Sequence, residues 1–340
     1  MPRLLKLRAP EVRPQSMARP CVLKPHTYRE NMLSRVANSI YWLARYIERA
    51  ENVARSIDVN LQLQLDLPGE ERPWEPVIQI AGNADDFFKK YVHVSIENAL
   101  MFLTFDKENP NSIISCVGAA RENARCVRER ISSELWIAIN QFYLKLNDPE
   151  MPQKALAGPH DFYNSVKEFS QLTAGIIQGT MNHDVTWNFT HLGTLLERAD
   201  QTSRILDVKY YILLPDVSMV GMALDTVQWN AVLKSVGAYE MFHRRNSNVT
   251  PHNVAEFLLL TEDFPRSLRY CLEKAEQCLK NIAYPVKSNA QSIRLLGKLR
   301  SDIAFSTIEE IIEQGLHEQI EKVQIRLNEL GTQIWKDFFC

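Results

Sequence analysis

The sequence contains two related segments about 150 residues apart, and this repeat constrains the fold more than any other feature. Residues 47–60 read IERAENVARSIDVN, and residues 196–209 read LERADQTSRILDVK. A constant offset of 149 aligns them, and three further positions hold close substitutes. The identical pairs are Glu48/Glu197, Arg49/Arg198, Ala50/Ala199, Arg55/Arg204, Asp58/Asp207 and Val59/Val208.

A second, ungapped register with an offset of 155 carries the repeat much further along the chain. Two tryptophans, two glycines and two prolines agree in this register, which chance rarely produces. The six-residue change of offset fits an insertion in the loop around Pro215 to Asp225. We therefore predict an internal duplication, supported by the pairs Trp74/Trp229, Gly82/Gly237, Phe87/Phe242, Pro110/Pro265 and Cys116/Cys271.

The apolar residues recur at helical spacing, and this periodicity predicts the fold class. Between residues 36 and 61 they step by three and four, as in an amphipathic helix that Pro68-Gly69 ends. No stretch alternates with a period of two residues. The predicted class is all-α, a helical bundle of two pseudo-two-fold related halves. Further helices are expected over about 84–105, 111–146, 160–181, 185–213, 224–244, 264–282 and 306–338.

The repeat and the prolines also predict the domain organisation. Residues 1–31 hold seven Lys or Arg, two Glu and five Pro. Because prolines break amphipathic helices, we expect a disordered extension there. Residues 32–181 would form the first helical repeat and residues 182–340 the second, within one continuous domain over 32–338. Asn109-Pro110 and Phe264-Pro265 are expected to open helices at equivalent places.

A polar stripe on the first helix is the main candidate for a functional site. Glu48, Asn52 and Arg55 share one face, and Glu197, Gln201 and Arg204 repeat the pattern. If the two helices pack antiparallel, Glu48 faces Arg204 and Arg55 faces Glu197 as a reciprocal ion-pair clamp. Alternatively, the stripe lines a pocket whose arginines bind a carboxylate or phosphate.

A third charged segment exists only in the first half. The sequence AARENAR supplies Arg121, Glu122 and Arg125, whereas the aligned second-half segment reads KAEQCLK. A structural role would more naturally persist in both copies. This asymmetry favours a site near the first half.

Composition excludes several classes of function and predicts the compartment. The net charge is −2, so no basic surplus indicates a nucleic-acid partner. Six cysteines without a CxxC pair argue against a thiolate zinc site and against a secreted disulfide framework. No window approaches the roughly 18 apolar residues that a membrane span requires. We expect a cytoplasmic protein.

The motifs of known catalytic and metal sites are absent or incomplete. A single ExxH, Glu240 to His243, does not suffice for a carboxylate di-metal bundle. Asp184 is expected to cap a helix, and Cys116 and Cys271 to be core residues. No phosphate-binding glycine loop and no GxSxG elbow is present. The sequence predicts no metal, no cofactor and no catalytic residue.

Several segments together resemble a known bacterial family. They are MLSRVANSIYWLARYIERAENVAR, AARENARCVRERISSELW, HLGTLLERADQTSRILDV and FPRSLRYCLEKA. They are similar to the Alpha-E family, a helical domain named for its recurring Glu-Arg pair. The resemblance covers about Met32 to Phe338. The family's pairs correspond to Glu48-Arg49 and Glu197-Arg198, with Arg55 and Arg204 extending each motif.

The resemblance implies a role beside another enzyme. Relatives are typically encoded next to, or fused to, a circularly permuted ATP-grasp ligase, often with a transglutaminase-like protein. The preferred hypothesis is a non-catalytic accessory subunit of an ATP-grasp amidoligase. Its rivals are an enzyme in which Glu48, Glu197 or Glu122 acts as general base, and a purely structural scaffold. A homo-oligomer is compatible with each of them.

Overall fold

The computed structural model describes residues 28–66, 74–82, 84–212, 223–283 and 290–340. Within these ranges the secondary structure consists of helices joined by turns, without a strand. The predicted all-α class is confirmed. No described helix combines the length and the apolar composition of a membrane span.

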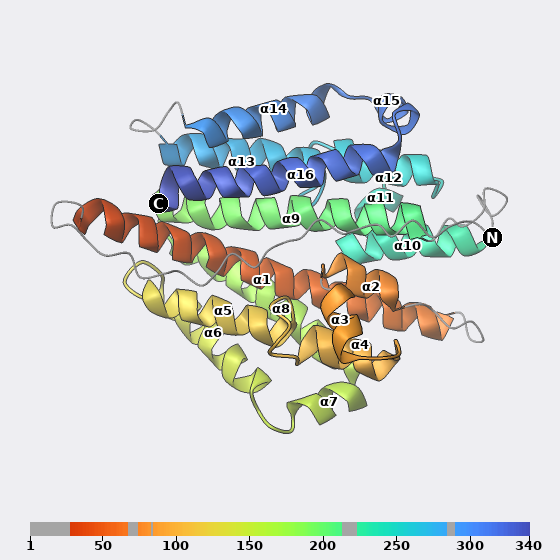
Figure 1. Ribbon diagram of the computed structural model, residues 1–340, viewed down its shortest axis with the longest axis horizontal. Coiled ribbons are helices and arrows are strands. Elements are labelled where there is room, and N and C mark those ends of the chain that lie inside the picture. The colour runs from red at the N-terminus through yellow and green to blue at the C-terminus, as the bar shows by residue number, and fades with distance from the viewer. Residues whose placement is uncertain (1–27, 67–73, 83, 213–222, 284–289) are drawn as a thin grey trace.

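The first half of the chain forms a unit of four long helices. Helix α1 packs against α5 and α8, α6 packs against both α5 and α8, and short helices connect them (Figure 1). The bounds are α1 Tyr28–Asp66, α2 Glu75–Ile80, α3 Ala84–Lys90, α4 Ile96–Thr104, α5 Ile113–Cys126, α6 Ser133–Leu146, α7 Met151–Ala157 and α8 Pro159–Thr180.

The second half repeats this arrangement. Helix α9 packs against α13 and α16, and α14 packs against both α13 and α16. In Figure 1 this unit lies above the first one. The bounds are α9 Val185–Ile212, α10 Ala223–Val236, α11 Tyr239–His243, α12 Pro251–Leu260, α13 Leu268–Ala283, α14 Gln291–Phe305, α15 Ile308–Glu313, α16 Leu316–Ile334 and η3 Trp335–Phe339.

The two units meet along α1 and α9, the helices that carry the Glu-Arg motif. Each unit also sends a short helix across the seam: α2 packs on α9, and α10 packs on α1. The backbones approach closely at Gly193, where an added Cβ would lie 2.4 Å from the carbonyl oxygen of Tyr41. A side chain at this position would push the helices apart, so glycine fixes the distance across which the motif residues reach.

Several predicted helices are interrupted where a polar side chain caps a new one. The predicted helix 84–105 divides into α3 and α4, and 111–146 divides into α5 and α6. The hydroxyls of Ser95 and Ser132 accept backbone N–H bonds at these new starts. The helices 224–244 and 306–338 divide at Gly237 and Gly315, which both have positive φ angles. Neither Pro110 nor Pro265 lies at a helix start, because both lie in turns before α5 and α13.

Residues that are paired in the repeat alignment also have similar surroundings in the structure. Gly82 and Gly237 both adopt positive φ angles. The thiols of Cys116 and Cys271 contact the carbonyl oxygens of Pro110 and Pro265, respectively. The division predicted at residue 181 falls in the turn between α8 and α9.

The predicted disordered extension, residues 1–31, lies largely outside the described residues. Helix α1 begins at Tyr28, so the prediction is wrong for residues 28–31. No proline lies between residues 26 and 31, and nothing in that stretch prevents the long amphipathic helix from extending backwards.

Candidate functional site

Glu197 of the second motif is bound by two arginines of the first half. Its oxygens accept hydrogen bonds from Nε of Arg45 and Nε of Arg49, each at 2.7 Å. Arg49 also donates from Nη2 to Glu197 at 3.0 Å and from Nη1 to Asn111 at 2.9 Å. Burial alone would raise the pKa of Glu197, but Arg49 and Arg45 lower it to about 2. The carboxylate is therefore ionised, and arginine donors occupy both of its oxygens.

Glu48 of the first motif is bound by two arginines of the second half. Oε1 accepts from Nη1 of Arg266 at 2.6 Å, and Oε2 lies 3.0 Å from Nε of Arg198. The motif arginines thus cross over: Arg49 pairs with Glu197, and Arg198 pairs with Glu48. The pairs are reciprocal, although Arg45 reinforces one of them and Arg266 the other.

Each motif also contains an ion pair within its own helix. Arg55 donates to Glu51 at 2.5 Å, and Arg204 donates to Asp200 at 2.9 Å. Glu51 accepts in addition from Arg266 at 2.7 Å and from the hydroxyl of Ser170 at 2.6 Å. Burial opposes its ionisation, but Arg266 and Arg55 lower the pKa of Glu51 to about 2.

The predicted pairing of Glu48 with Arg204, and of Arg55 with Glu197, is wrong. It assumed antiparallel motif helices, whereas α1 and α9 run in the same direction (Figure 1). The order of contacts shows the same direction. Tyr41 of α1 contacts Gly193 of α9, and Arg49, further along α1, contacts Glu197, which is further along α9. Parallel helices place the two Glu-Arg pairs opposite each other and leave Arg55 and Arg204 to bind their own helices.

The network carries more positive than negative charge. Its six guanidinium groups bind four carboxylates, so two positive charges remain in excess among the described residues. Such an excess is costly in a buried setting unless an anion balances it. The acids are Glu48, Glu51, Glu197 and Asp200, and the arginines are Arg45, Arg49, Arg55, Arg198, Arg204 and Arg266.

A cavity of about 520 Å³ adjoins the network between α1, α8, α9 and α13. Glu48 and Arg198 form part of its wall, so one of the two crossing pairs lies at a cavity and the other, Arg49 with Glu197, does not line it. Its other polar lining residues are Ser170, Thr173, Gln178, Asn188, Thr190, His191, Thr194, Tyr270, Lys274, Gln277 and Asn281.

An aromatic stack forms one side of this cavity at the start of α9. The ring of Trp187 stacks on His191 with 3.6 Å between ring centroids, and on His183 with 4.3 Å. Burial and the nearby charge of Arg198 lower the pKa of His191 to about 4. His191 is therefore neutral at physiological pH, and the rings of Trp187 and His191 form a flat part of the wall. Trp187 lines the cavity.

The remaining predicted residues divide into network and surface groups. Asn52 joins the network, because its Oδ1 accepts from Arg266 at 2.9 Å. Gln201 is buried on α9 but does not line the cavity. Arg121, Glu122 and Arg125 bond one another and α6 at the surface, and they lie outside the cavity wall. The expected site near the AARENAR segment is therefore not part of this arrangement.

Sequence reasoning missed four residues of the network, Arg45, Glu51, Asp200 and Arg266. Glu51 aligns with Asp200, so these two acids were visible in the repeat. Arg45 lies one turn before the Glu-Arg pair, but the aligned position of the second half holds Thr194. Arg266 was detectable only through the second register, where it aligns with Asn111. The difference changes the pairing. Asn111 accepts a hydrogen bond from Arg49, whereas Arg266 donates to Oε1 of Glu48, the glutamate that pairs with Arg198.

Several isolated residues have the roles predicted for them. The carboxylate of Asp184 accepts backbone N–H bonds from Thr186 and Trp187, so it caps α9. Cys116 and Cys271 are fully buried, and burial raises the pKa of each thiol to about 12. Both are core residues, because a thiol with such a pKa stays protonated at neutral pH.

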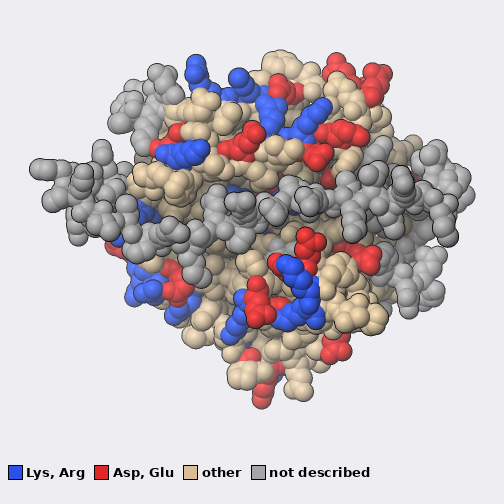
Figure 2. All heavy atoms as spheres, viewed as in Figure 1, with Lys and Arg blue, Asp and Glu red and all other residues tan. Residues whose placement is uncertain are grey.

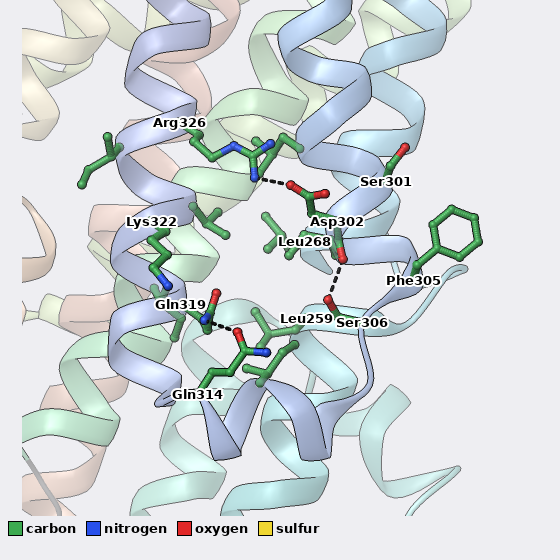
Figure 3. Close-up of a pocket in the computed structure, with 16 residues that line it drawn as sticks. Leu259, Leu268, Ser301, Asp302, Phe305, Ser306, Gln314, Gln319, Lys322 and Arg326 are labelled. Atoms are coloured by element: carbon green, nitrogen blue, oxygen red, sulfur yellow. Dashed lines mark hydrogen bonds and ion pairs between the residues drawn. The ribbon is translucent and has the colours of Figure 1, made fainter.

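A second cavity, of about 690 Å³, lies between α14, α15 and α16. Figure 3 shows Arg326 of α16 directed toward Asp302 of α14, and Gln319 directed toward Gln314. The side chain of Phe305 points away from the cavity and is 83% exposed. Most of the polar groups here bind one another over a largely apolar lining, so this cavity offers few groups for recognising a polar ligand.

Charged side chains of both signs also lie on the outer surface. On the face shown in Figure 2, positive and negative side chains are interspersed on the described residues of both units.

Comparison with known proteins places this arrangement in a family. The Alpha-E model, described as a predicted alpha-helical domain with a conserved ER motif, matches residues 32–339. An uncharacterized protein of Mycobacterium bovis is 23% identical over 312 residues, covering 85% of this chain and 34% of the relative. Uncharacterized proteins of two Mycobacterium tuberculosis strains are 23% and 22% identical with the same coverage. The chain spans about a third of these relatives' length, and no solved structure matches it.

Proposed function

Because the chain belongs to the Alpha-E family, we propose that it is a non-catalytic accessory subunit of a bacterial ATP-grasp amidoligase system. The observation that carries the proposal is the closed network at the seam. The glutamate of each Glu-Arg pair, Glu48 and Glu197, is held by two guanidinium groups of the opposite unit. A motif used in this way joins two helical units into one rigid body and leaves chemistry to a partner.

The size of the relatives supports a partnership. About two thirds of each mycobacterial relative lies outside the matched region. A helical domain attached to further chain in these proteins is what an accessory role predicts. The family resemblance supplies the nature of the partner, an ATP-grasp ligase, together with a transglutaminase-like protein. Since such a ligase consumes ATP, the proposal places this chain in the cytoplasm.

The rival hypothesis of a general base receives little support from the geometry. A base that works at neutral pH needs a pKa near the operating pH. The pKa of Glu197 is about 2, and two arginines occupy its oxygens. Glu48 is bound by Arg198 and Arg266, and Glu122 forms a surface ion pair. A purely structural scaffold, in turn, has no need of a polar cavity beside the motif.

The partnership is tested by co-purification of the full chain with the ATP-grasp protein encoded beside it. ADP release by the ligase is then measured with and without this chain. We expect a stable complex and a change in the rate of ADP release. If the two proteins do not associate and ADP release is unaffected, the proposal is wrong. If the isolated chain converts a substrate of the system by itself, the enzyme hypothesis replaces it.

The proposal includes a shared origin of the two units. A duplicated helical unit whose copies meet through a pseudo-two-fold axis accounts for the crossing ion pairs, since each copy supplies the same acid and the same base. The equivalent pairs of Asp58 with His160 and Asp207 with His317 support this origin.

A further inference from the structure

We propose that the cavity between α1, α8, α9 and α13 binds a carboxylate through Arg198 and Lys274. This inference goes beyond the accessory role and does not depend on it, because it concerns only groups of this chain. It begins from a difference between two arginines that occupy equivalent positions in the repeat.

Arg49 is saturated with protein partners, whereas Arg198 is not. Arg49 donates from all three of its nitrogens, to Glu197 and to Asn111. Arg198 has one partner among the described residues, the oxygen of Glu48 that lies 3.0 Å from its Nε. That N–H is not directed at the oxygen, since Nε makes no hydrogen bond. The two terminal amino groups of Arg198 bond no described residue.

Arg266 causes this difference. It stands where the first half has Asn111, and it binds Oε1 of Glu48. The bidentate grip that Arg49 has on Glu197 is therefore not available to Arg198. The guanidinium of Arg198 lines the cavity, and its side chain is 22% exposed although the Nε atom is buried. A planar pair of donors on a cavity wall fits the two oxygens of a carboxylate.

The surrounding charges favour an anionic ligand. The network holds two positive charges in excess, and Lys274 adds another cation that has no ion pair among the described residues. Its ammonium lies 5.5 Å from the ring centroid of Tyr270, a second lining residue. The carboxylate of Glu48 is also in the wall and would repel a dianion such as phosphate. A monoanionic carboxylate offsets part of the excess and meets about half of this repulsion.

Neutral groups complete the site. Gln178, Asn188 and Thr194 supply amide and hydroxyl groups on the wall, and His191 stays neutral down to acidic pH. The buried indole N–H of Trp187 has no hydrogen-bond partner. Buried donors normally find an acceptor, so an acceptor on a bound ligand would satisfy this one. The volume, about 520 Å³, is in the range of small-molecule sites.

Binding to the full chain is measured by isothermal titration calorimetry with four probes at millimolar concentration. N-acetylglycine carries a carboxylate, and N-acetylglycinamide is its neutral counterpart. Trialanine with a free C-terminus distinguishes a peptide terminus from a small acid, and inorganic phosphate represents a dianion. We expect the carboxylates to bind at least about tenfold more tightly than the amide, since hydrogen bonds between charged groups are the stronger ones. Trialanine bound more tightly than N-acetylglycine would identify a peptide terminus as the preferred source of the carboxylate, and the reverse order would identify a small acid.

Two variants and their controls locate the binding. Lys274→Gln removes the unpaired cation, and Lys280→Gln makes the same change on α13 outside the cavity wall. Ala174→Trp fills the cavity from α8, and Leu172→Trp adds the same ring on the exposed face of that helix. We expect Lys274→Gln and Ala174→Trp to weaken binding about tenfold or more at unchanged melting temperature, and the controls to bind as the natural chain does.

Four results would overturn the proposal. One is the absence of binding by every carboxylate, and another is equal binding of the amide. The third is binding that neither Lys274→Gln nor Ala174→Trp weakens. Tighter binding of phosphate than of N-acetylglycine would likewise reject a carboxylate site. These outcomes are independent of the ligase experiment, which measures association and ADP release.

Discussion

At the scale of single residues, the two Glu-Arg motifs form ion pairs with each other across the seam between the units. Each motif glutamate is bound by the motif arginine of the other copy, and one further arginine reinforces each pair. Because the charges are buried, they stabilise the fold only when every charged group has its partner. A buried pair adds little over an apolar contact, but removing one partner leaves the other charged and alone.

The completeness of the Glu197 cluster leads to the first prediction. Glu197→Gln removes the charge that Arg45 and Arg49 share, and both guanidinium groups stay buried. We expect a loss of about 3–5 kcal/mol in the free energy of unfolding, measured by urea denaturation. Glu122→Gln removes an acid from an exposed ion pair and should cost less than about 1 kcal/mol. Equal effects of the two substitutions would contradict this account.

The pKa values of the buried acids predict how stability depends on pH. The pKa of Glu197 and that of Glu51 fall from 4.5 to about 2 on folding. A lowered pKa means that the unfolded chain binds protons first as the pH drops. The stabilisation is thus complete above pH 4.5 and is lost as the pH falls toward 2, by on the order of 3 kcal/mol for each group.

The measurement is the urea midpoint of the natural chain and of Glu197→Gln at several pH values across this window. The variant lacks one of the two titrating groups, so its stability should decline less steeply with falling pH. Parallel curves for the two proteins would show that Glu197 does not titrate as described.

At the scale of helices, the contact of α1 with α9 depends on one glycine. Gly193 lets the carbonyl of Tyr41 approach to a distance that no side chain tolerates. Gly193→Ala should separate the two helices and destabilise the fold by about 1–3 kcal/mol, despite the higher helix propensity of alanine. Gly175→Ala on α8 meets open space and should be neutral or mildly stabilising. Thermal unfolding of both variants tests this prediction. An unchanged melting temperature of Gly193→Ala would show that α1 and α9 do not approach as closely as described.

Helix boundaries show what the apolar pattern could and could not predict. The long helices α8 and α9 were predicted to within one residue of their bounds, because their apolar stripes are uninterrupted. Helix α1 begins eight residues before and ends five residues after the apolar stripe over 36–61 that predicted it. The breaks before α4 and α6 were missed, since neither contains proline or glycine. A serine cap marks each new start, but a serine within an apolar stripe is equally compatible with a continuing helix.

At the scale of the whole molecule, the two units are interlocked rather than merely adjacent. Helix α2 of the first unit packs on α9, α10 of the second packs on α1, and the crossing ion pairs lie between them. Separating the units would expose buried charges on both sides. We therefore expect the chain to unfold in a single cooperative transition.

Fragments test this cooperativity. Residues 32–181 and 182–340, produced separately, should lack cooperative thermal unfolding and dispersed amide NMR signals. Mixing the two fragments should restore both properties, because each supplies the counter-charges of the other. A fragment that unfolds cooperatively by itself would show that the units are independent domains.

The sequence by itself determined the helical class, the long helices and the two Glu-Arg segments, because periodicity and repeated residues are properties of the chain alone. It also identified Glu48, Arg198 and Glu197 as a related set. The tertiary structure decided which acid meets which base. That pairing follows from the parallel direction of α1 and α9 and from the distance that Gly193 allows between them. Only the folded chain brings Arg266 to Glu48, across 218 residues, and thereby leaves Arg198 facing a cavity.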